Sequence, residues 1–475
     1  MSLTTKVGFL AGATATTIAG AAFGGTSANV SYEDLQQRLD AAEAKIAELS
    51  TSQNADWLTE QRADDIRGLV QDVLADADTR ASLQGSGMQA GYNNGFVISS
   101  NDGQWMLRIN GLLQNRFVVS HTRDNQNPTL AGALGAGGPG EKTHDGFETT
   151  RAVLNFSGTV AKDYHFNVRL NYSPYSGGNT PSPDQLEWAY ASMDLSDEMN
   201  LQIGKQKFDV MREYMVNAEF QQAIERSLYS YYWGTSSITN GIKLNYANDM
   251  FRANVMYSNG PAVNIAALSS VGLNIDNGQY SQNQADWMLS GRVAWKASGT
   301  WEQFDEMTSP QGTEAGILIG MGWAVMDGND KLTGNDDGTN WMLSWDASMD
   351  FGGWNVFGSI TLGDDKQNAF GQAVSGNQWG WMVQGGYYLT EDIELYGRYE
   401  WLDPRISGVS HDDIEIMTFG ANWYLAGQNA KLSIDWGYNF DKTVTAGVGG
   451  GGYTNWLNSA QRNEWVLRTQ MQLYF

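Results

Sequence analysis

Apolar and polar residues alternate with a period of two from Trp105 to the C-terminus, and no other feature of the sequence limits the fold as strongly. Residues 164–172, for example, read Tyr-His-Phe-Asn-Val-Arg-Leu-Asn-Tyr. Such alternation is typical of strands that have one apolar and one polar face. Sixteen runs of this kind lie at residues 104–119, 149–160, 164–173, 185–194, 199–206, 240–247, 250–258, 286–297, 315–326, 339–351, 353–363, 378–389, 392–402, 414–425, 430–440 and 463–475.

The number, length and spacing of these runs predict an all-β transmembrane barrel of about 16 antiparallel strands. Tight connections such as 161–163 alternate with long ones such as 120–148, so one end of the barrel would carry short turns and the other end long loops. The connection 298–314 is an exception, because it is long where a short turn is expected. A soluble β-sandwich or propeller is the alternative, since the strands of those folds also alternate.

The aromatic content favours the membrane barrel. The 475 residues include 18 Trp, 21 Tyr and 17 Phe, yet the mean hydropathy is −0.40. Only alternate residues of a barrel strand meet lipid, which keeps the mean hydropathy low. Fourteen tryptophans fall on the apolar phase, which we assign to lipid and to its interface with water. They are Trp105, Trp188, Trp287, Trp295, Trp323, Trp341, Trp345, Trp354, Trp379, Trp381, Trp401, Trp423, Trp436 and Trp465.

Charge and cysteine content exclude several other classes of protein. The 29 Lys and Arg stand against 53 Asp and Glu, and this net charge of −24 argues against a nucleic-acid partner. The absence of cysteine excludes disulfides, a lipoprotein anchor and thiolate metal sites. The four histidines show neither metal-ligand spacing nor a nucleophile motif. We therefore expect no catalytic site, no metal site and no cofactor.

The residues before the barrel divide into four segments. Residues 1–28 have one early cation, an uncharged run and small residues before Ala28, and so predict a secretory signal peptide. Residues 29–54 predict a short α-helical coiled-coil stalk, and 55–84 a second amphipathic helix. Residues 85–103 are glycine-rich and predict a linker, which leaves 104–475 for the barrel. The coiled-coil seam consists of Tyr32, Leu35, Leu39, Ala42, Ile46 and Leu49.

A single amphipathic helix packed on its own domain is the alternative for the stalk. At the other end of the chain, apolar residues recur at two-residue intervals up to the terminal Phe475. This ending resembles the C-terminal signature that outer-membrane barrel proteins present to their assembly machinery. Together with a signal peptide it predicts a barrel in the lipid of the outer membrane, with the stalk in the periplasm.

Two pairs of segments carry a family resemblance. Residues 156–159 read Phe-Ser-Gly-Thr and are followed by Lys-Asp-Tyr at 162–164. Residues 203–207 read Ile-Gly-Lys-Gln-Lys and are followed by Ile-Glu-Arg-Ser at 224–227. These segments resemble the phosphate-selective porin O and P family, although Phe208 stands where the family usually has proline. The resemblance implies a homotrimer of sixteen-stranded barrels whose third long loop, residues 207–239 here, folds into the lumen.

The charged residues in and beside this loop are therefore the candidate pore constriction: Lys205, Lys207, Asp209, Arg212, Glu213, Glu219, Glu225 and Arg226. For each of them, a solvated loop charge or a wall salt bridge is the alternative to contact with a solute.

The polar phase of the strands predicts which charges line the lumen. Its eleven cations are Arg108, Arg116, Arg151, Arg169, Lys243, Arg252, Arg292, Lys296, Arg398, Lys431 and Arg468. Its seven acids are Glu187, Asp346, Asp350, Glu394, Glu400, Asp435 and Glu464. Charges that line a narrow pore outweigh remote surface charge, so we expect a weak preference for anions.

Together with the family resemblance, these patterns predict a porin that lets small hydrophilic solutes and ions diffuse passively across the outer membrane. The alternative is a structural envelope tether that links the outer membrane to the cell wall. In that case the stalk would bind peptidoglycan and the barrel would serve only as an anchor.

Overall fold

The computed structural model describes residues 88–122, 142–172, 186–234, 238–260, 287–327, 339–364, 376–405, 413–441, 455–456 and 462–475. The predicted signal peptide (1–28), coiled coil (29–54) and amphipathic helix (55–84) lie outside the described residues. Within the described part of the chain, no helix has the length and apolar character needed to cross a membrane.

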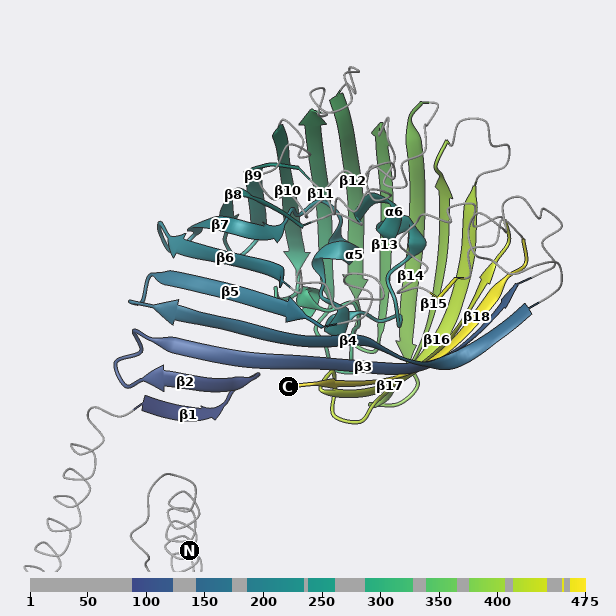
Figure 1. Ribbon diagram of the computed structural model, residues 1–475, viewed down its shortest axis with the longest axis horizontal. Coiled ribbons are helices and arrows are strands. Elements are labelled where there is room, and N and C mark those ends of the chain that lie inside the picture. Colours follow the sequence, from purple (N-terminus) through teal and green to yellow (C-terminus); the bar gives the residue numbers. More distant parts are fainter. Residues whose placement is uncertain are drawn as a thin grey trace, which may run out of the picture. The chain divides into compact units, whose positions relative to one another are not determined.

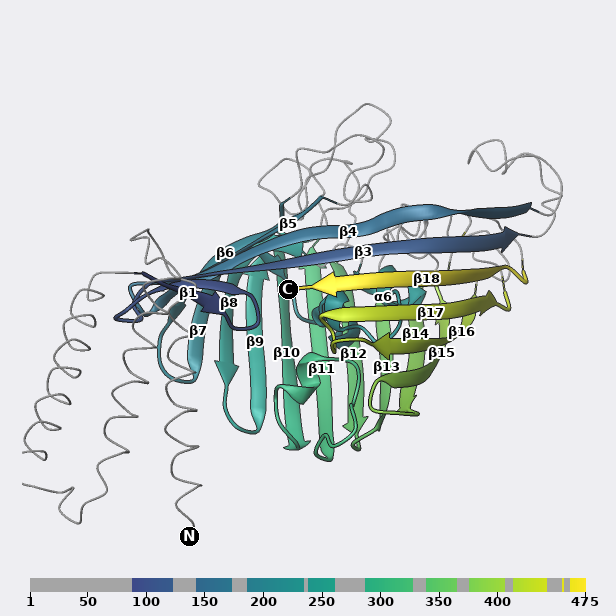
Figure 2. The ribbon, with the colours of Figure 1, turned by 90° about the horizontal axis from the view of Figure 1, so that it is seen from below.

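Sixteen antiparallel strands form the barrel in the part of the chain that the structure describes, as the alternation predicted (Figure 1). The barrel closes where the last strand pairs with the first, for example Thr469 opposite Phe117 (Figure 2). The strands are β3 (Met106–Thr122), β4 (Lys142–Val160), β5 (Tyr164–Asn171), β6 (Leu186–Asp194), β7 (Met199–Lys207), β8 (Ile238–Ala247), β9 (Phe251–Ser258), β10 (Trp287–Ser298), β11 (Gly316–Asp327), β12 (Thr339–Asp350), β13 (Trp354–Asp364), β14 (Gln378–Tyr388), β15 (Ile393–Asp403), β16 (Ile414–Tyr424), β17 (Ala430–Asn439) and β18 (Trp465–Tyr474).

The region predicted as a linker contains a β-hairpin, formed by β1 (Met88–Tyr92) and β2 (Phe96–Ser100). Its turn contains Asn94 and Gly95, which both have positive φ, and Asn-Gly is a strong hairpin signal. Strand β18 pairs with β3 only as far as residue 112 of β3. Nearer the start of β3, residues 106–109 pair with β2 instead. The hairpin therefore extends the sheet along β3 past the end of β18.

The side chains alternate between the two faces of the barrel. In β12, for example, Ser344, Asp346 and Ser348 are buried, whereas Trp341 and Trp345 lie exposed on the outer face. The assignment of the tryptophans to the outer face holds for those on β10 to β18.

The assignment of Trp188 to lipid is wrong. A bulge skips Glu187 in the pairing of β5 with β6, so Arg169 lies opposite Trp188 and Leu170 lies opposite Leu186. This shift turns the Trp188 side chain, which is 7% exposed, to the same face as Arg169.

The connection between β7 and β8 contains α5 (Arg212–Met215), the 3-10 turn η2 (Ala218–Phe220) and α6 (Leu228–Gly234). Figure 1 shows α5 and α6 among the barrel strands. Most of the connection is buried, including Val210, Ile224 and Tyr229. Since Val210 and Tyr229 share a core cluster with inward-facing residues such as Phe357 and Met382, the connection lies inside the barrel.

Candidate pore constriction

We refer to residues 208–234 as the inner loop. Its anchors lie on strands all around the barrel, including β4, β10, β15 and β17. Arg292 of β10 donates to the Val210 carbonyl at 3.0 Å. Opposite, Lys431 of β17 donates to the Gln221 carbonyl at 2.9 Å. The loop therefore crosses the lumen.

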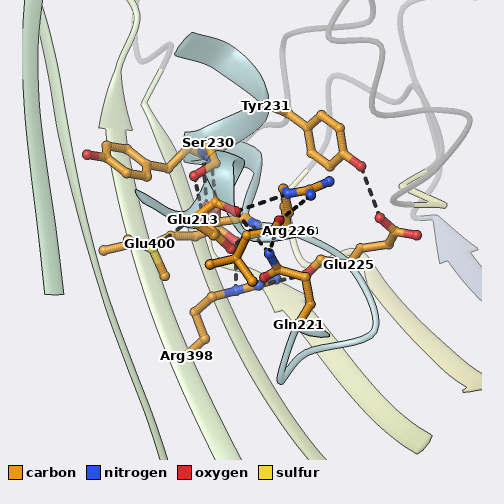
Figure 3. A network of polar contacts seen from close by, with 12 residues as sticks. Glu213, Gln221, Glu225, Arg226, Ser230, Tyr231, Arg398 and Glu400 are labelled. Carbon is orange, nitrogen blue, oxygen red and sulfur yellow. Dashed lines mark hydrogen bonds and ion pairs between the residues drawn. The ribbon is translucent and has the colours of Figure 1, made fainter. Parts of the chain in front are cut away.

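One anchor is an ion-pair cluster around Glu225, whose carboxylate Figure 3 shows beside the Tyr231 hydroxyl. Arg151 of β4 donates to the two carboxylate oxygens of Glu225, at 2.6 and 2.8 Å, and Arg116 of β3 donates to one of them. The Tyr231 hydroxyl adds a hydrogen bond of 3.0 Å. Burial raises the pKa of Glu225, but Arg151 and Arg116 outweigh it and hold this pKa below its usual range. Glu225 therefore remains ionised at neutral pH.

A second cluster ties the two helices of the inner loop together (Figure 3). The Glu213 carboxylate accepts the backbone N–H of Ser227 at 2.9 Å and the hydroxyls of Ser227 and Ser230. Arg226 donates to the carbonyls of Glu213 and Val216 at 3.1 and 2.6 Å. Because these contacts bind α5 to the start of α6, the loop holds a fixed shape.

A third anchor lies on β5. Arg169 donates to both carboxylate oxygens of Glu219, at 3.0 and 3.1 Å, and to Glu187 at 3.0 Å. The Trp188 ring lies between two cations, 4.9 Å from the Arg169 guanidinium and 5.1 Å from the Lys207 ammonium. Lys207 also donates to the carbonyls of Tyr214 and Met215 at the end of α5. These contacts explain why the bulge turns Trp188 inward.

The first residues of the inner loop are held by the wall of β8, β9 and β12. Asp209 accepts hydrogen bonds from Lys243 at 2.8 Å and from Asn254 at 3.1 Å. Arg212 donates to the Ser348 hydroxyl at 2.8 Å and to the Glu306 carbonyl at 3.1 Å. Burial lowers the pKa of Arg212 to about 10, so the side chain stays protonated near neutral pH.

The structure brings seven of the eight candidate constriction residues together in or against the inner loop. Lys205 lies apart from them: it is buried in the wall and donates to the Leu186 carbonyl at 2.8 Å. Each of the four loop acids, from Asp209 to Glu225, contacts a basic wall residue. Each of these four acids thus forms an ion pair with the wall.

Eight of the eleven predicted wall cations also form ion pairs. The pairs are Arg116 and Arg151 with Glu225, Arg169 with Glu219 and Glu187, Lys243 with Asp209, Arg252 with Asp305, Arg292 with Asp346, Arg398 with Glu213 and Glu400, and Arg468 with Asp435. Arg108, Lys296 and Lys431 have no carboxylate within 4 Å among the described residues, although the Lys296 ammonium lies 5.4 Å from the Trp301 ring. Most of the basic wall charge is therefore neutralised locally.

Sequence reasoning missed two sets of lumen residues. Tyr229 is fully buried, its N–H donates to Glu400 at 2.9 Å, and its hydroxyl bonds Ser359 at 2.9 Å. The second set lies in the connection between β10 and β11, where Phe304 and Met307 are buried. In both cases the sequence signal was the presence of large apolar side chains in a long connection, which indicates that the connection is buried.

A cavity of about 480 Å³ separates part of the inner loop from the wall of β8 to β11. Its lining includes Asp209, Arg212, Phe220, Arg252, Trp301 and Phe304. Its polar and aromatic walls would hold water or a small hydrophilic solute. Among the described residues, no group of His, Asp and Glu could hold a metal ion.

Several solved structures are similar to this chain. The chain is 12% identical to outer-membrane expressed OmpT of Vibrio cholerae over 80% of this chain and 100% of that one, with a TM-score of 0.48. It is 11% identical to an anion-selective porin from Comamonas acidovorans, over 78% and 100% of the two chains and with a TM-score of 0.49. It is 12% identical to the outer membrane channel DcaP of Acinetobacter baumannii, over 81% of this chain and 100% of that one, with a TM-score of 0.47.

No curated protein sequence matches the chain. The sequence model of one family, described as phosphate-selective porin O and P, matches residues 136–475 and so covers most of the barrel. The match agrees with the closed sixteen-stranded sheet and its inner loop, and it indicates a channel in the outer membrane rather than an enzyme. The chain belongs to the phosphate-selective porin O and P family.

Proposed function

We propose that this protein lets small hydrophilic solutes and ions diffuse passively across the outer membrane, with the inner loop as its constriction. One observation carries the proposal: the inner loop crosses the lumen and is bonded to nearly opposite walls, at the Val210 carbonyl by Arg292 of β10 and at the Gln221 carbonyl by Lys431 of β17. A sixteen-stranded barrel leaves an aqueous channel, and a loop fixed inside it sets the largest solute that passes.

We further propose that the preference for anions is weak. The inner loop with Lys207 adds three cations and four acids to the lumen, so the excess of cations predicted for the wall falls from four to three. Paired charges of opposite sign largely cancel at a distance, which weakens the field that a passing ion meets. Arg108, Lys296 and Lys431, which lack such partners among the described residues, would supply most of the remaining preference.

The outer face supports a homotrimer. Strands β10 to β18 carry twelve outward tryptophans, whereas β3 to β9 carry none on that face. Near the middle of β3, outward Asn115 accepts a hydrogen bond from Thr149 at 2.7 Å, a polar pair that lipid would not satisfy. We propose that this face contacts the neighbouring subunits and that the tryptophan-rich face meets lipid.

The C-terminal strand supports recognition by the assembly machinery. Phe475 exchanges two backbone hydrogen bonds with Gly111, at 2.8 and 3.0 Å, so the terminal residue is part of the closing seam. We propose that the machinery holds this strand until β3 replaces it. The tether alternative rests on residues 29–84, outside the described part of the chain, and no contact in the barrel favours it.

Single-channel recording of the purified protein in a planar bilayer under a salt gradient tests the proposal. We expect conductance steps in groups of three and a zero-current potential with the sign of a weak anion preference. A protein that inserts as a folded trimer but never conducts would overturn the porin assignment. Cation selectivity would be consistent with a porin but would contradict the predicted preference for anions.

A further inference from the structure

The connection between β10 and β11, residues 299–315, does not behave like the other turns at its end of the barrel. The neighbouring turns 248–250 and 351–353 are tight. This connection contains the 3-10 turn η3 (Gln303–Asp305) and folds inward. Met307 and Thr308 are each 3% exposed, and Ser309 is fully buried. A solvated surface turn would leave such residues exposed, so this one belongs to the interior of the barrel.

The connection reaches strands well beyond its own neighbours. Asn355 of β13 donates to the Met307 carbonyl at 2.9 Å. The Thr308 hydroxyl donates to Glu394 of β15 at 2.7 Å and also bonds the Tyr388 hydroxyl of β14 at 2.9 Å. These partners stand two to four strands away from β11 around the barrel. The connection therefore extends across part of the lumen.

The connection also meets the inner loop directly. The backbone N–H of Met307 donates to the Phe220 carbonyl at 3.0 Å. Arg212 donates to the Glu306 carbonyl at 3.1 Å, and its guanidinium lies 5.8 Å from the Phe304 ring. Two segments that enter from opposite ends of the barrel thus meet inside it. Both also line the 480 Å³ cavity, which lies beside their contact.

The charge of the connection differs from that of the wall. Residues 299–315 contain four acids, Glu302, Asp305, Glu306 and Glu314, and no basic residue. Asp305 pairs with Arg252 of the wall, and the Glu306 carboxylate accepts a hydrogen bond from Gln428 at 2.9 Å. The connection therefore adds acidic and no basic side chains at the end of the barrel that carries the short turns.

We propose that residues 299–315 form a second constriction. In it, Glu306, Met307 and Thr308 act with the inner loop to limit the size of permeating solutes and to weaken the preference of the channel for anions. This inference rests on the proposed porin function. A solute that crosses the barrel has to pass both segments. The connection is then a specificity-determining element rather than an unusually long turn.

Replacement of residues 300–313 by Asn-Gly, which favours a tight hairpin turn, tests the inference. We expect the single-channel conductance to rise about twofold or more, larger neutral sugars to enter proteoliposomes, and the zero-current potential to move further toward anions. The change in potential distinguishes loss of the acidic segment from simple loosening of the barrel. A folded trimer with unchanged conductance, sugar cutoff and potential would overturn the inference.

Point variants keep the test open if the replacement fails to fold. Asn355→Ala and Thr308→Val each remove one contact that holds the segment across the lumen, and we expect both to raise the conductance by a smaller factor than the replacement. Gln311→Ala, at an exposed position of the same segment, is the matched control and should match the native protein. Equal conductance in all four proteins would contradict the inference.

The two proposals fail in different ways. If the native trimer conducts and the replacement does not change it, only the second constriction is excluded. If the native trimer and the replacement both remain sealed, the porin function is excluded as well. A sealed native trimer that conducts after the replacement would support the second constriction in its strongest form.

Discussion

Arg151 of β4 holds Glu225 of the inner loop through two hydrogen bonds, at 2.6 and 2.8 Å, and both side chains are almost fully buried. Arg116 binds the same carboxylate from β3, so two wall cations share one loop acid. Two guanidinium groups this close would repel each other without that acid. Without the loop, the wall would hold two buried cations that repel each other, and without the wall, Glu225 would lack its cationic partners.

Glu225→Gln removes the negative charge that the buried Arg151 and Arg116 share, and leaves Glu148 as the remaining carboxylate beside Arg116. We expect a loss of about 3 kcal/mol in the free energy of unfolding, together with a noisier open-channel current as the loop loosens. Tyr231→Phe, which removes the hydroxyl that donates to the same carboxylate but keeps the carboxylate charge, should cost about 1 kcal/mol. Urea unfolding in detergent and bilayer recording measure the two effects. Equal stability of native and Gln variants would contradict the anchoring role.

Glu306 should contribute to the pH dependence of selectivity. Burial raises the pKa of Glu306; the Gln428 hydrogen bond and Lys431 oppose this shift, whereas Asp305 and Glu394 add to it. Because the folded pKa of this carboxyl is raised, the fold gains stability as the pH falls through it, and the turn then loses one negative charge. Between about pH 7 and about pH 5, Glu225 keeps its charge because its pKa is lowered.

We therefore expect the zero-current potential to move toward anions as the pH falls over this range. Bilayer recording under a fixed salt gradient at each pH measures it. The shift should be smaller in Glu306→Gln than in the native protein. The same shift in both proteins would mean that another group titrates.

The proposed subunit face can be tested at Asn115. Asn115→Trp places a large ring where a neighbouring subunit would pack, and we expect trimers to dissociate into monomers. Ile319→Trp is the matched control, because Ile319 is an exposed outward residue of β11 on the tryptophan-rich face. Light scattering of the detergent-solubilised proteins gives the oligomeric state. A trimeric Asn115 variant would place the interface elsewhere.

The packing of Phe475 on Gly111 predicts an effect of one methyl group. A Cβ atom at Gly111 would come within 2.3 Å of the Phe475 ring, whereas one at Gly146 would meet nothing within 4 Å. Gly111→Ala should lower the free energy of unfolding by about 2 kcal/mol, because the ring has to leave its position. Gly146→Ala should leave it nearly unchanged. Urea titrations in detergent measure the stability of both variants. Identical unfolding curves would contradict this packing.

The alternation of residues predicted the strands and the closed sheet, because each barrel strand has one face to lipid and one to the lumen. The two-residue period alone could not predict where a bulge exchanges the residues that face the lumen with those that face outward. At Glu187 and Trp188 the bulge depends on cations from β5 and β7 that gather around one indole ring. Such a contact is set by the packing of distant segments and leaves no local pattern in β6.

The family resemblance located the inner loop but not its contacts. The polar phase of the strands predicted a basic lumen wall, whereas in the fold most of those cations pair with acids, many of them from the loop. The hairpin of β1 and β2 was detectable, since Asn94-Gly95 is a strong turn signal between two short strands. The inward course of residues 299–315 was not, because its partners Asn355 and Glu394 lie on strands that follow much later in the chain.

The seam between β3 and β18 has a consequence for how the molecule is made. Arg116 and Gln470, which bond each other across it, are 354 positions apart in the chain. A contact of such high sequence separation has a large entropic cost before it yields any stabilisation, so closure should be the slow step of folding. Until β18 has been exported, the edge of β3 remains unpaired and prone to aggregation, which makes assisted insertion a kinetic requirement of this topology.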